Sequence, residues 1–332
     1  MTLDLPLIWA GIIATAVLLY VLLDGFDLGI GILFPFATPR ERDVMMESIA
    51  PVWDGNETWL VLGGGGLLAA FPLAYGTILS ALYAPIVAML LALIFRGVAF
   101  EFRWRDAGHR AWWDIAFSVG SIVAAFAQGV TLGALLQGIA VENRAYAGGW
   151  FDWLTPFSAL VGICLIVGYA LLGATWLIMK SEGTLQVRCY RMAFGLGIGT
   201  ILAIAAVSAA TPFLSEVYWQ RWFAWPQVLF TAQVPLLVTI AAVVFFASLM
   251  RRHHYTPFLM TLLIFTLSLA GLGISLFPYV VPPTISIWDA AAPDASLTFM
   301  LPGALVMVPI ILAYTGYSYW VFRGKTGHEG YH

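Results

Sequence analysis

Long apolar runs dominate the chain, and each is about the length needed to cross a bilayer. The runs lie at residues 6–34, 51–70, 76–100, 115–139, 155–179, 191–211, 227–250, 257–277 and 299–322. A transmembrane helix takes about 20 apolar residues. Backbone groups in hydrocarbon must be hydrogen-bonded internally, so only helices or closed barrels cross it, and the alternating pattern of barrel strands is absent. The runs therefore predict an all-α polytopic membrane protein with nine transmembrane helices, forming a single transmembrane domain over residues 1–332.

Composition agrees with a surface that faces lipid. Of the 332 residues, 61% are hydrophobic and only 10% are charged, whereas about a quarter of the residues in a soluble domain are charged. So few charges cannot cover a water-facing surface of this size. The net charge of −3 does not indicate a nucleic-acid partner.

The basic residues predict the orientation of the helices. With nine spans and an outer N-terminus, all but Arg144 and Arg221 of the 15 Lys and Arg residues fall in segments on the cytoplasmic side. Cytoplasmic loops carry such an excess of Lys and Arg, and one helix more or fewer would destroy the asymmetry. The pattern thus predicts an outer N-terminus and a cytoplasmic C-terminus.

Cysteine and histidine usage argues against metal or haem ligation from the spans. Cys164 and Cys189 have no CxxC neighbour and lie at different predicted depths, so we expect two unpaired thiols. Membrane cytochromes usually bind haem through histidines of their helices. All five histidines fall in inner loops or the tail, namely His109, His253, His254, His328 and His332. We therefore expect no haem or metal bound directly by side chains of this chain.

Two acidic pairs stand inside the predicted spans. Asp24 and Asp27 lie in the first span, and Asp54 and Glu57 open the second. Each pair is spaced i,i+3, so both carboxyl groups share one helix face. The topology puts both pairs in the cytoplasmic half of the membrane, where Arg96 at the inner end of the third span is the nearest charge partner. Gly25 and Gly29 form a small-xxx-small pair, which indicates a close helix contact.

Two interpretations of these acids stay open. In the functional one, like charges and poor solvation make the carboxyl groups able to hold and pass protons, with Asp54 the first candidate and Glu57 the second. In the structural one, the acids cap and cross-link helices through Arg96, Asn56, Thr58 and the backbone. Glu101 and Asp114 are expected at the inner interface, either solvated or in ion pairs.

Several segments have sequences that are typical of one protein family, namely Gly25–Gly29, Ser48–Leu60, Phe95–Arg103, Leu135–Gly138, Phe277–Pro282, Trp288–Ala290 and Val308–Tyr314. In these segments the chain resembles subunit II of cytochrome bd-type quinol oxidases. These segments are spread over the whole chain. The Trp53-Asp54-Gly55-Asn56 block in a membrane setting is the most specific of them.

The resemblance implies a fold and a role. It implies nine helices arranged as two four-helix bundles plus one peripheral helix, in the inner membrane of a bacterium. The partner would be a similarly folded subunit I that carries two b haems, haem d and the quinol-oxidising loop. The complex oxidises quinol near the outer face, reduces O2 to water and takes protons from the cytoplasm. Subunit II would be haem-free, would stabilise subunit I and would line the proton route.

The resemblance also implies roles for residues. The acid of the Trp-Asp-Gly-Asn block, Asp54 here, belongs to a proton path, and Glu101 matches a second proposed acid that is Asp in some relatives. Some relatives bind a structural quinone in this subunit, and a small single-helix subunit can join the complex; neither maps onto particular residues here. The short loop between the sixth and seventh spans is typical of the cyanide-insensitive branch.

Two other classes of protein could also place acids within helices. A proton-coupled secondary transporter would show a midplane site with broken helices and an internal repeat, and we find no clear repeat. A purely structural membrane scaffold would use its acids only to join helices. Asp54→Asn distinguishes these classes, because a proton route predicts loss of turnover in an assembled complex.

Overall fold

A computed structural model of the chain describes residues 3–326, so that His328 and His332 lie outside the described residues. Eight of the described helices are long and apolar enough to cross a membrane, and a bent pair provides up to a ninth crossing. The eight are α1 (Leu5–Leu33), α5 (Tyr83–Arg105), α6 (Arg110–Gln137), α7 (Pro156–Lys180), α8 (Gly183–Ala210), α11 (Gln233–Met250, preceded by α10, Val228–Thr231), α12 (Thr256–Leu276) and α14 (Asp294–Val321). The described chain is thus an all-helical polytopic membrane protein, as predicted.

The bent pair consists of α3 (Trp53–Ala70) and α4 (Pro72–Ala81), which turn by 119° at Phe71. Proline disfavours helical backbone in the residue before it, and Phe71 has φ −133° and ψ 62°. The sequence prediction joined residues 76–81 to the third span. In the structure these residues belong to α4, and α5 begins only after a second break at Leu82.

Other helix bounds differ because polar turns hide helix ends from a hydropathy pattern. The predicted sixth span begins at residue 191, whereas α8 begins at Gly183 and includes Arg188 and Arg191. Likewise α5 continues past the predicted residue 100 to Arg105. Charged side chains are favourable where a helix leaves the hydrocarbon, so these helices continue into the polar layer.

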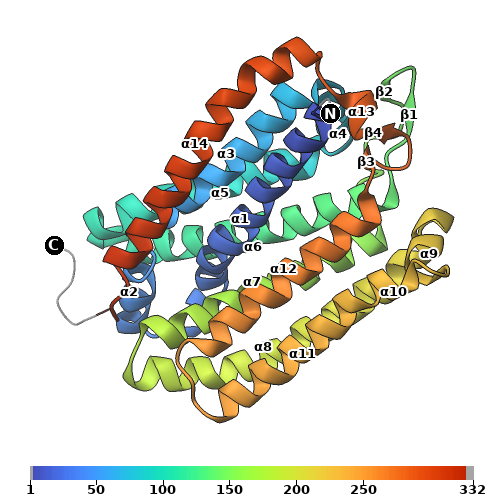
Figure 1. The fold of residues 1–332 in the computed structure, drawn as a ribbon. Helices are drawn as coiled ribbons and strands as arrows, with labels where there is room; N and C mark the ends of the chain where they lie inside the picture. Colours follow the sequence, from blue (N-terminus) through green and yellow to red (C-terminus); the bar gives the residue numbers. More distant parts are fainter. Residues whose placement is uncertain (1–2, 327–332) are drawn as a thin grey trace.

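Short helices and strands lie at the two ends of the bundle. At one end lies α2 (Pro39–Glu47), which begins with a capping box between Thr38 and Glu41. The other end carries the N-terminus and most of the remaining short elements (Figure 1). These are β1 (Val141–Glu142), β2 (Ala145–Tyr146), β3 (Tyr279–Val281), β4 (Ile285–Ser286), α9 (Glu216–Phe223), α13 (Ile287–Ala290) and the 3₁₀ turn Thr211–Phe213 beside α9. Two further 3₁₀ turns, Phe34–Phe36 and Ala107–His109, lie between α1 and α2 and between α5 and α6. Each strand pair is antiparallel.

Helix α1 is the central element of the packing. It contacts α3, α6 and α7, while α5 packs on α6, α8 on α7 and α11 on α12. Helix α14 runs along one edge, beside α3 and α1 (Figure 1), and little of its surface is buried. The start of α1 and the end of α14 lie at opposite ends of the bundle (Figure 1).

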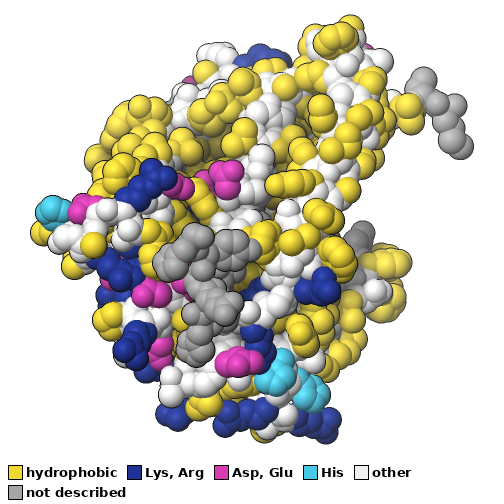
Figure 2. Space-filling view, turned by 90° about the vertical axis from the view of Figure 1, so that its left-hand side faces the viewer, with side chains coloured by type: hydrophobic (Ala, Val, Ile, Leu, Met, Phe, Trp, Pro, Cys, Tyr) yellow, Lys and Arg dark blue, Asp and Glu magenta, His cyan; other side chains and the backbone are white. Residues whose placement is uncertain are grey.

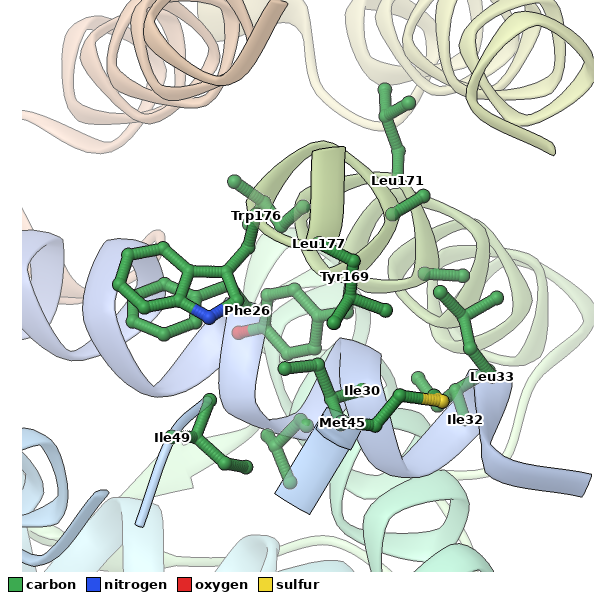
Figure 3. Close-up of a cluster of buried hydrophobic side chains, with 14 of the residues drawn as sticks. Phe26, Ile30, Ile32, Leu33, Met45, Ile49, Tyr169, Leu171, Trp176 and Leu177 are labelled. Atoms are coloured by element: carbon green, nitrogen blue, oxygen red, sulfur yellow. The ribbon is translucent and has the colours of Figure 1, made fainter. Parts of the chain in front are cut away.

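The predicted glycine contact joins α1 to α7. A Cβ atom on Gly29 would lie 1.9 Å from the Tyr169 carbonyl oxygen and 2.7 Å from the Gly173 nitrogen, so only glycine fits there. This close approach positions the core beside it, where the rings of Phe26 and Trp176 stack with centroids 4.2 Å apart (Figure 3). Both cysteines are free, Cys164 in α7 and Cys189 in α8.

Charged side chains gather at the end of the bundle that carries α2. Figure 2 views the molecule from that side and shows many Lys, Arg, Asp and Glu side chains there, with hydrophobic side chains covering much of the remaining visible surface. This end holds Arg42, Arg103, Arg110, Arg188 and Arg252. The acidic pairs of the sequence lie in the half of the bundle next to it.

Candidate functional site

Arg96 on α5 is the centre of a buried charge cluster. Its side chain is 0% exposed, and one terminal nitrogen lies 2.9 Å from Asp24 Oδ1 and 2.6 Å from Glu57 Oε1. The other terminal nitrogen lies 3.8 Å from Asp27 Oδ2. Asp24 and Asp27 are also 0% exposed, whereas the Glu57 side chain is 27% exposed at the edge of the cluster. One guanidinium therefore faces three carboxyl groups from two other helices.

A polar bridge connects the cluster to α14. The Asn56 amide donates to Asp27 Oδ2 at 2.8 Å, and its oxygen accepts from the Tyr319 hydroxyl at 2.9 Å. Asn56 is buried and projects from α3 next to Glu57. Because buried polar groups must be paired, these contacts fix the position of α14 against α1 and α3 at this depth.

A second group of polar side chains lies between α1, α6 and α7. The Tyr20 hydroxyl, one turn before Asp24 on α1, accepts a hydrogen bond from the Gln128 amide at 2.7 Å. The Tyr169 hydroxyl in turn donates to Gln128 Oε1 at 2.8 Å. Tyr20 and Tyr169 are almost completely buried. These hydrogen bonds join α1, α6 and α7 one helical turn from the Arg96 cluster.

The remaining predicted site residues lie outside the buried cluster. Asp54 is exposed in the first turn of α3, one turn from Glu57. Glu101 is 60% exposed and forms an i,i+4 ion pair with Arg105 at 3.4 Å. The structure therefore brings Asp24, Asp27 and Glu57 together around Arg96. It leaves Asp54 at the surface of this chain beside them, and it does not bring Glu101 to the cluster.

A second charge cluster lies two turns further along α5, at the α2 end. Arg103 is 1% exposed; its Nε lies 2.5 Å from Asp114 Oδ1 and its terminal nitrogen 2.8 Å from Asp43. Arg42 also pairs with Asp114 at 2.8 Å, and Arg110 pairs with Asp43. Asp114 therefore forms ion pairs, which is one of the two environments that the sequence predicted for it, the other being exposure to solvent. This cluster joins α2, α5 and α6.

Outside the spans, local hydrogen bonds set the pKa of two acids. Between α5 and α6, a hydrogen bond from His109 lowers the pKa of Asp106. In α13, the Ser286 hydroxyl and backbone lower the pKa of Asp289. Both carboxyl groups stay ionised at neutral pH, and neither lies at the Arg96 cluster.

The chemistry open to the Arg96 cluster is proton exchange. If all three carboxyl groups were ionised, the cluster would carry an excess of two negative charges in the membrane interior, where net charge is costly. Carboxyl groups that share a site with too few cations keep protons instead. Among the described residues, no group of His, Cys, Asp and Glu is placed to hold a metal ion. The cluster is thus suited to holding and passing protons.

Sequence reasoning missed the hydrogen-bonded polar residues that lie next to the cluster. Tyr20, Gln128 and Tyr169 are polar side chains within predicted spans, and Tyr20 precedes Asp24 by four positions, which places both on one helix face. That spacing was the available signal. Gln128 and Tyr169 are on other helices, and nothing in the sequence says which faces of those helices meet.

The fold and the cluster together define the class of protein: a polytopic, all-helical membrane protein with a buried carboxyl–arginine centre. Residues 5–322 match the family model described as cytochrome bd terminal oxidase subunit II. The chain belongs to this family.

Curated relatives and a solved structure agree with the assignment. The chain is 30% identical to the cytochrome bd-I ubiquinol oxidase subunit 2 of Escherichia coli strain K12, over 98% of this chain and 96% of the relative. It is also 30% identical to the cytochrome bd ubiquinol oxidase subunit 2 of Bacillus subtilis, over 97% of both chains. Its fold matches a chain of the bd oxidase from Geobacillus thermodenitrificans with a TM-score of 0.81 at 16% identity, covering 96% of this chain and 99% of that one.

Proposed function

We propose that this chain lines a proton-uptake route in its quinol oxidase complex, and that Glu57 is the group through which protons enter the Arg96 cluster. The chain is a subunit of a bacterial membrane quinol oxidase, so its complex reduces O2 to water and consumes protons. The observation that carries the proposal is the arrangement of Asp24, Asp27 and Glu57 around a single arginine. Glu57 is the partly exposed member, so it is the contact with the outside of the bundle.

Asp54 is the proton carrier that precedes Glu57 in the proposed route. It precedes Glu57 by one helical turn and is exposed on α3. A carboxyl group on a membrane helix does not face hydrocarbon but faces protein or water. We therefore place the haem-bearing subunit I, with the water held between the two chains, over this face of α3. Protons would pass from Asp54 to Glu57, enter the Arg96 cluster there, and go on from the cluster to the partner.

Glu101 stands apart from this route. It is well exposed and paired with Arg105 near the end of α5 that joins the charged end of the bundle. We propose that it takes part in a separate path, which would also run along the surface that faces the partner. Asp24 and Asp27 would support the first route as members of the cluster.

The orientation and the helix grouping belong to the same proposal. Placing the charged α2 end in the cytoplasm puts the cluster in the inner half of the membrane, in agreement with the preference of Lys and Arg for cytoplasmic loops. We assign α1, α3, α5 and α6 to one four-helix bundle and α7, α8, α11 and α12 to the other, with α14 peripheral. Within the groups α5 packs on α6, α1 on α3 and α6, α8 on α7, and α11 on α12, while α7 also packs on α1 and α6 and so joins the two groups.

The haems of the complex belong to the partner in this proposal. The described histidines do not fit a haem site in the membrane. His109 lies in the turn between α5 and α6, and His253 and His254 lie in the turn between α11 and α12, all exposed to solvent at the charged end. The substrate would be a quinol and the acceptor O2. A structural quinone and a small additional subunit remain further proposals without assigned residues.

Glu57→Gln tests the proton route. The amide keeps the size of the side chain but cannot carry a proton, so we expect quinol-driven O2 consumption to fall by about 10²-fold or more. Haem content and the yield of the complex should stay at the wild-type level. Asp54→Asn should give a loss of the same kind but smaller, because water can replace an exposed carrier.

Glu142→Gln is the matched control, since Glu142 lies exposed in the β1–β2 hairpin at the opposite end. Wild-type turnover in Glu57→Gln, with all haems in place, would reject the route and favour a structural scaffold. A proton-coupled transporter gains no support from the fold, because the break between α3 and α4 lies away from the acids.

A further inference from the structure

Lys180 is a buried amine that has no part in the proton route just described. It is the last residue of α7 and is 6% exposed, and no carboxyl group of residues 3–326 pairs with it. A buried charge is costly unless polar groups surround it. The Lys180 amine donates to the backbone oxygen of Phe322 and, at 3.2 Å, to that of Gly324. Lys180 therefore holds the end of another helix, α14.

Helix α14 needs such an anchor because little else fixes it. Leu297, near its start, is the only residue of α14 that is buried, and its carbonyl oxygen accepts from the Trp9 indole at 3.2 Å. Pro302 and Pro309 interrupt the backbone hydrogen bonds between the two ends. The last carbonyl groups of a helix lack partners within it, and a cation beside them is favourable. Lys180 thus anchors one end of α14, and Trp9 anchors the other.

The segment after α14 is tied to the same place. The Thr326 backbone nitrogen donates to the Lys180 carbonyl at 2.9 Å, and the Thr326 hydroxyl donates to the same oxygen at 3.2 Å. Lys325 pairs with Glu182, two residues beyond the end of α7, at 3.0 Å. Hydrogen bonds thus run in both directions between Lys180 and residues 322–326. We call this set of contacts the α14 clasp.

The α14 clasp lies one helical turn from a side chain that touches the Arg96 cluster. Tyr319 precedes Phe322 by three positions, and its hydroxyl donates to Asn56, whose amide donates to Asp27. The Tyr319 ring meets the Trp176 ring edge-on at 6.0 Å. The Lys180 amine lies over that same tryptophan, 5.1 Å from the ring centre. A displacement of α14 at the clasp would therefore carry the Tyr319 hydroxyl with it.

We propose that Lys180 is a positioning residue for the Arg96 cluster. By holding the end of α14, it keeps the Tyr319 hydroxyl at Asn56, and Asn56 in turn orients Asp27. This inference rests on the proposed proton route and deepens it, because it connects a helix at the edge of the bundle to the carboxyl groups of the route. Lys180 itself neither carries protons nor touches the cluster.

Infrared spectroscopy of the purified complex tests the positioning role without relying on turnover. With ¹³C-labelled tyrosine, the band that Tyr319→Phe removes belongs to Tyr319. In Lys180→Met the Tyr319 hydroxyl should lose Asn56, so this band should move from its wild-type frequency. Lys180→Gln keeps an uncharged donor, should move the band less, and replaces Lys180→Met if that variant lowers the yield of the complex.

Turnover in single and double variants shows whether Lys180 acts through Tyr319. Lys180→Met and Tyr319→Phe should each lower O2 consumption per haem about threefold, because each removes the same hydrogen bond to Asn56. The double variant should also lose about threefold, whereas two independent effects would multiply to about ninefold. A merely structural role for Lys180 would lower the yield and leave turnover per haem unchanged.

Trp9→Phe is the matched control, because it removes the hydrogen bond that anchors the other end of α14. It should lower the thermal midpoint of the complex but change neither the Tyr319 band nor turnover per haem. The inference is overturned if the Tyr319 band stays in place in the lysine variants, or if it moves equally in Trp9→Phe. Normal turnover in Glu57→Gln would instead refute the proton route, and the infrared result would still show whether Lys180 positions Tyr319.

Discussion

Helix α5 carries two buried arginines, each in a cluster of charged side chains. Acidic groups outnumber basic groups in one cluster, and basic groups outnumber acidic groups in the other. Arg96 and Arg103 are two helical turns apart, and both side chains are at most 1% exposed. Arg96 alone faces three carboxyl groups, Asp24, Asp27 and Glu57. Around Arg103 the ratio of basic to acidic groups is reversed. Three arginines, Arg42, Arg103 and Arg110, share two carboxyl groups, Asp43 and Asp114.

This difference separates a site that can hold protons from one that joins helices. An excess of carboxyl groups in a poorly solvated place is neutralised most readily by protons. An excess of guanidinium groups cannot be neutralised that way, because arginine does not lose its proton. The Arg103 cluster therefore contributes fixed positive charge at the α2 end, while the Arg96 cluster has the excess of carboxyl groups that the proposed proton route requires.

Replacing each arginine by glutamine should show the largest difference between the two clusters. In Arg96→Gln the buried acids lose their cation, which costs about 3–5 kcal/mol when a buried pair is broken. We expect turnover of the complex to fall by about 100-fold or more, together with a lower yield. In Arg103→Gln, Asp43 and Asp114 keep Arg110 and Arg42, so turnover per haem should stay within about twofold of wild type. Equal losses in both variants would contradict the comparison.

Glycine substitutions test how closely α5 packs against its neighbours next to Arg96. A Cβ on Gly120 of α6 would lie 2.7 Å from the Ala92 carbonyl oxygen and 3.3 Å from Arg96 Cβ, so Gly120→Ala forces α5 and α6 apart. We expect a cost of about 1–3 kcal/mol, visible as a lower thermal midpoint of the complex. On α5 itself, Gly97→Ala meets nothing nearer than 3.6 Å, at the Trp53 ring, and serves as the control. A larger loss in Gly97→Ala would show that the packing is wrongly described.

Removing single hydrogen bonds should have a different effect at each cluster. Tyr319→Phe deletes the donor to Asn56, which orients Asp27, and a bond of this kind contributes about 0.5–1.5 kcal/mol. We expect turnover to fall about threefold. Asp114→Asn in the second cluster should lower the thermal midpoint and leave turnover per haem unchanged. If Asp114→Asn lowered turnover and Tyr319→Phe did not, the functional and structural roles assigned to the two clusters would be wrong.

The smallest effect is expected at the exposed turn between α5 and α6. The hydrogen bond from His109 lowers the pKa of Asp106, so its contribution to stability is present above the ordinary aspartate pKa. It is lost as the pH falls through the lowered value of the folded state. His109→Gln should therefore lower the thermal midpoint at neutral pH by about 1 °C or less, since exposed pairs contribute little. The difference from wild type should vanish once Asp106 is protonated, and a difference that grows in acid would contradict this assignment.

Much of the fold could be predicted from the sequence because hydrocarbon imposes one strict pattern. The long apolar runs correspond to the long helices. The prediction that Gly25 and Gly29 mark a close helix contact is confirmed, because Gly25 lies against the Tyr169 ring and Gly29 against the backbone of α7. What failed was the segment from Pro72 to Ala81. It is as apolar as a span, and only its backbone turn at Phe71 distinguishes it from one.

The candidate site could be predicted only in part. The i,i+3 acidic pairs predicted two shared faces, and Arg96 lies between them as expected. The exposure of Asp54 depends on how α3 is rotated against α1, and periodicity does not give this rotation for a helix whose apolar residues lie on all sides. The chain from Tyr20 to Tyr169 depends on contacts among three helices distant in sequence, which no local pattern contains.

Proton uptake measured in sealed vesicles tests the central claim most directly. A pH-sensitive dye would report on the compartment that faces the α2 end while a limited amount of O2 is reduced. We predict that the wild-type complex makes this compartment alkaline, and that Glu57→Gln slows the change by about 10²-fold while Glu142→Gln does not. Uptake at the wild-type rate in Glu57→Gln, or uptake from the opposite compartment, would contradict the account.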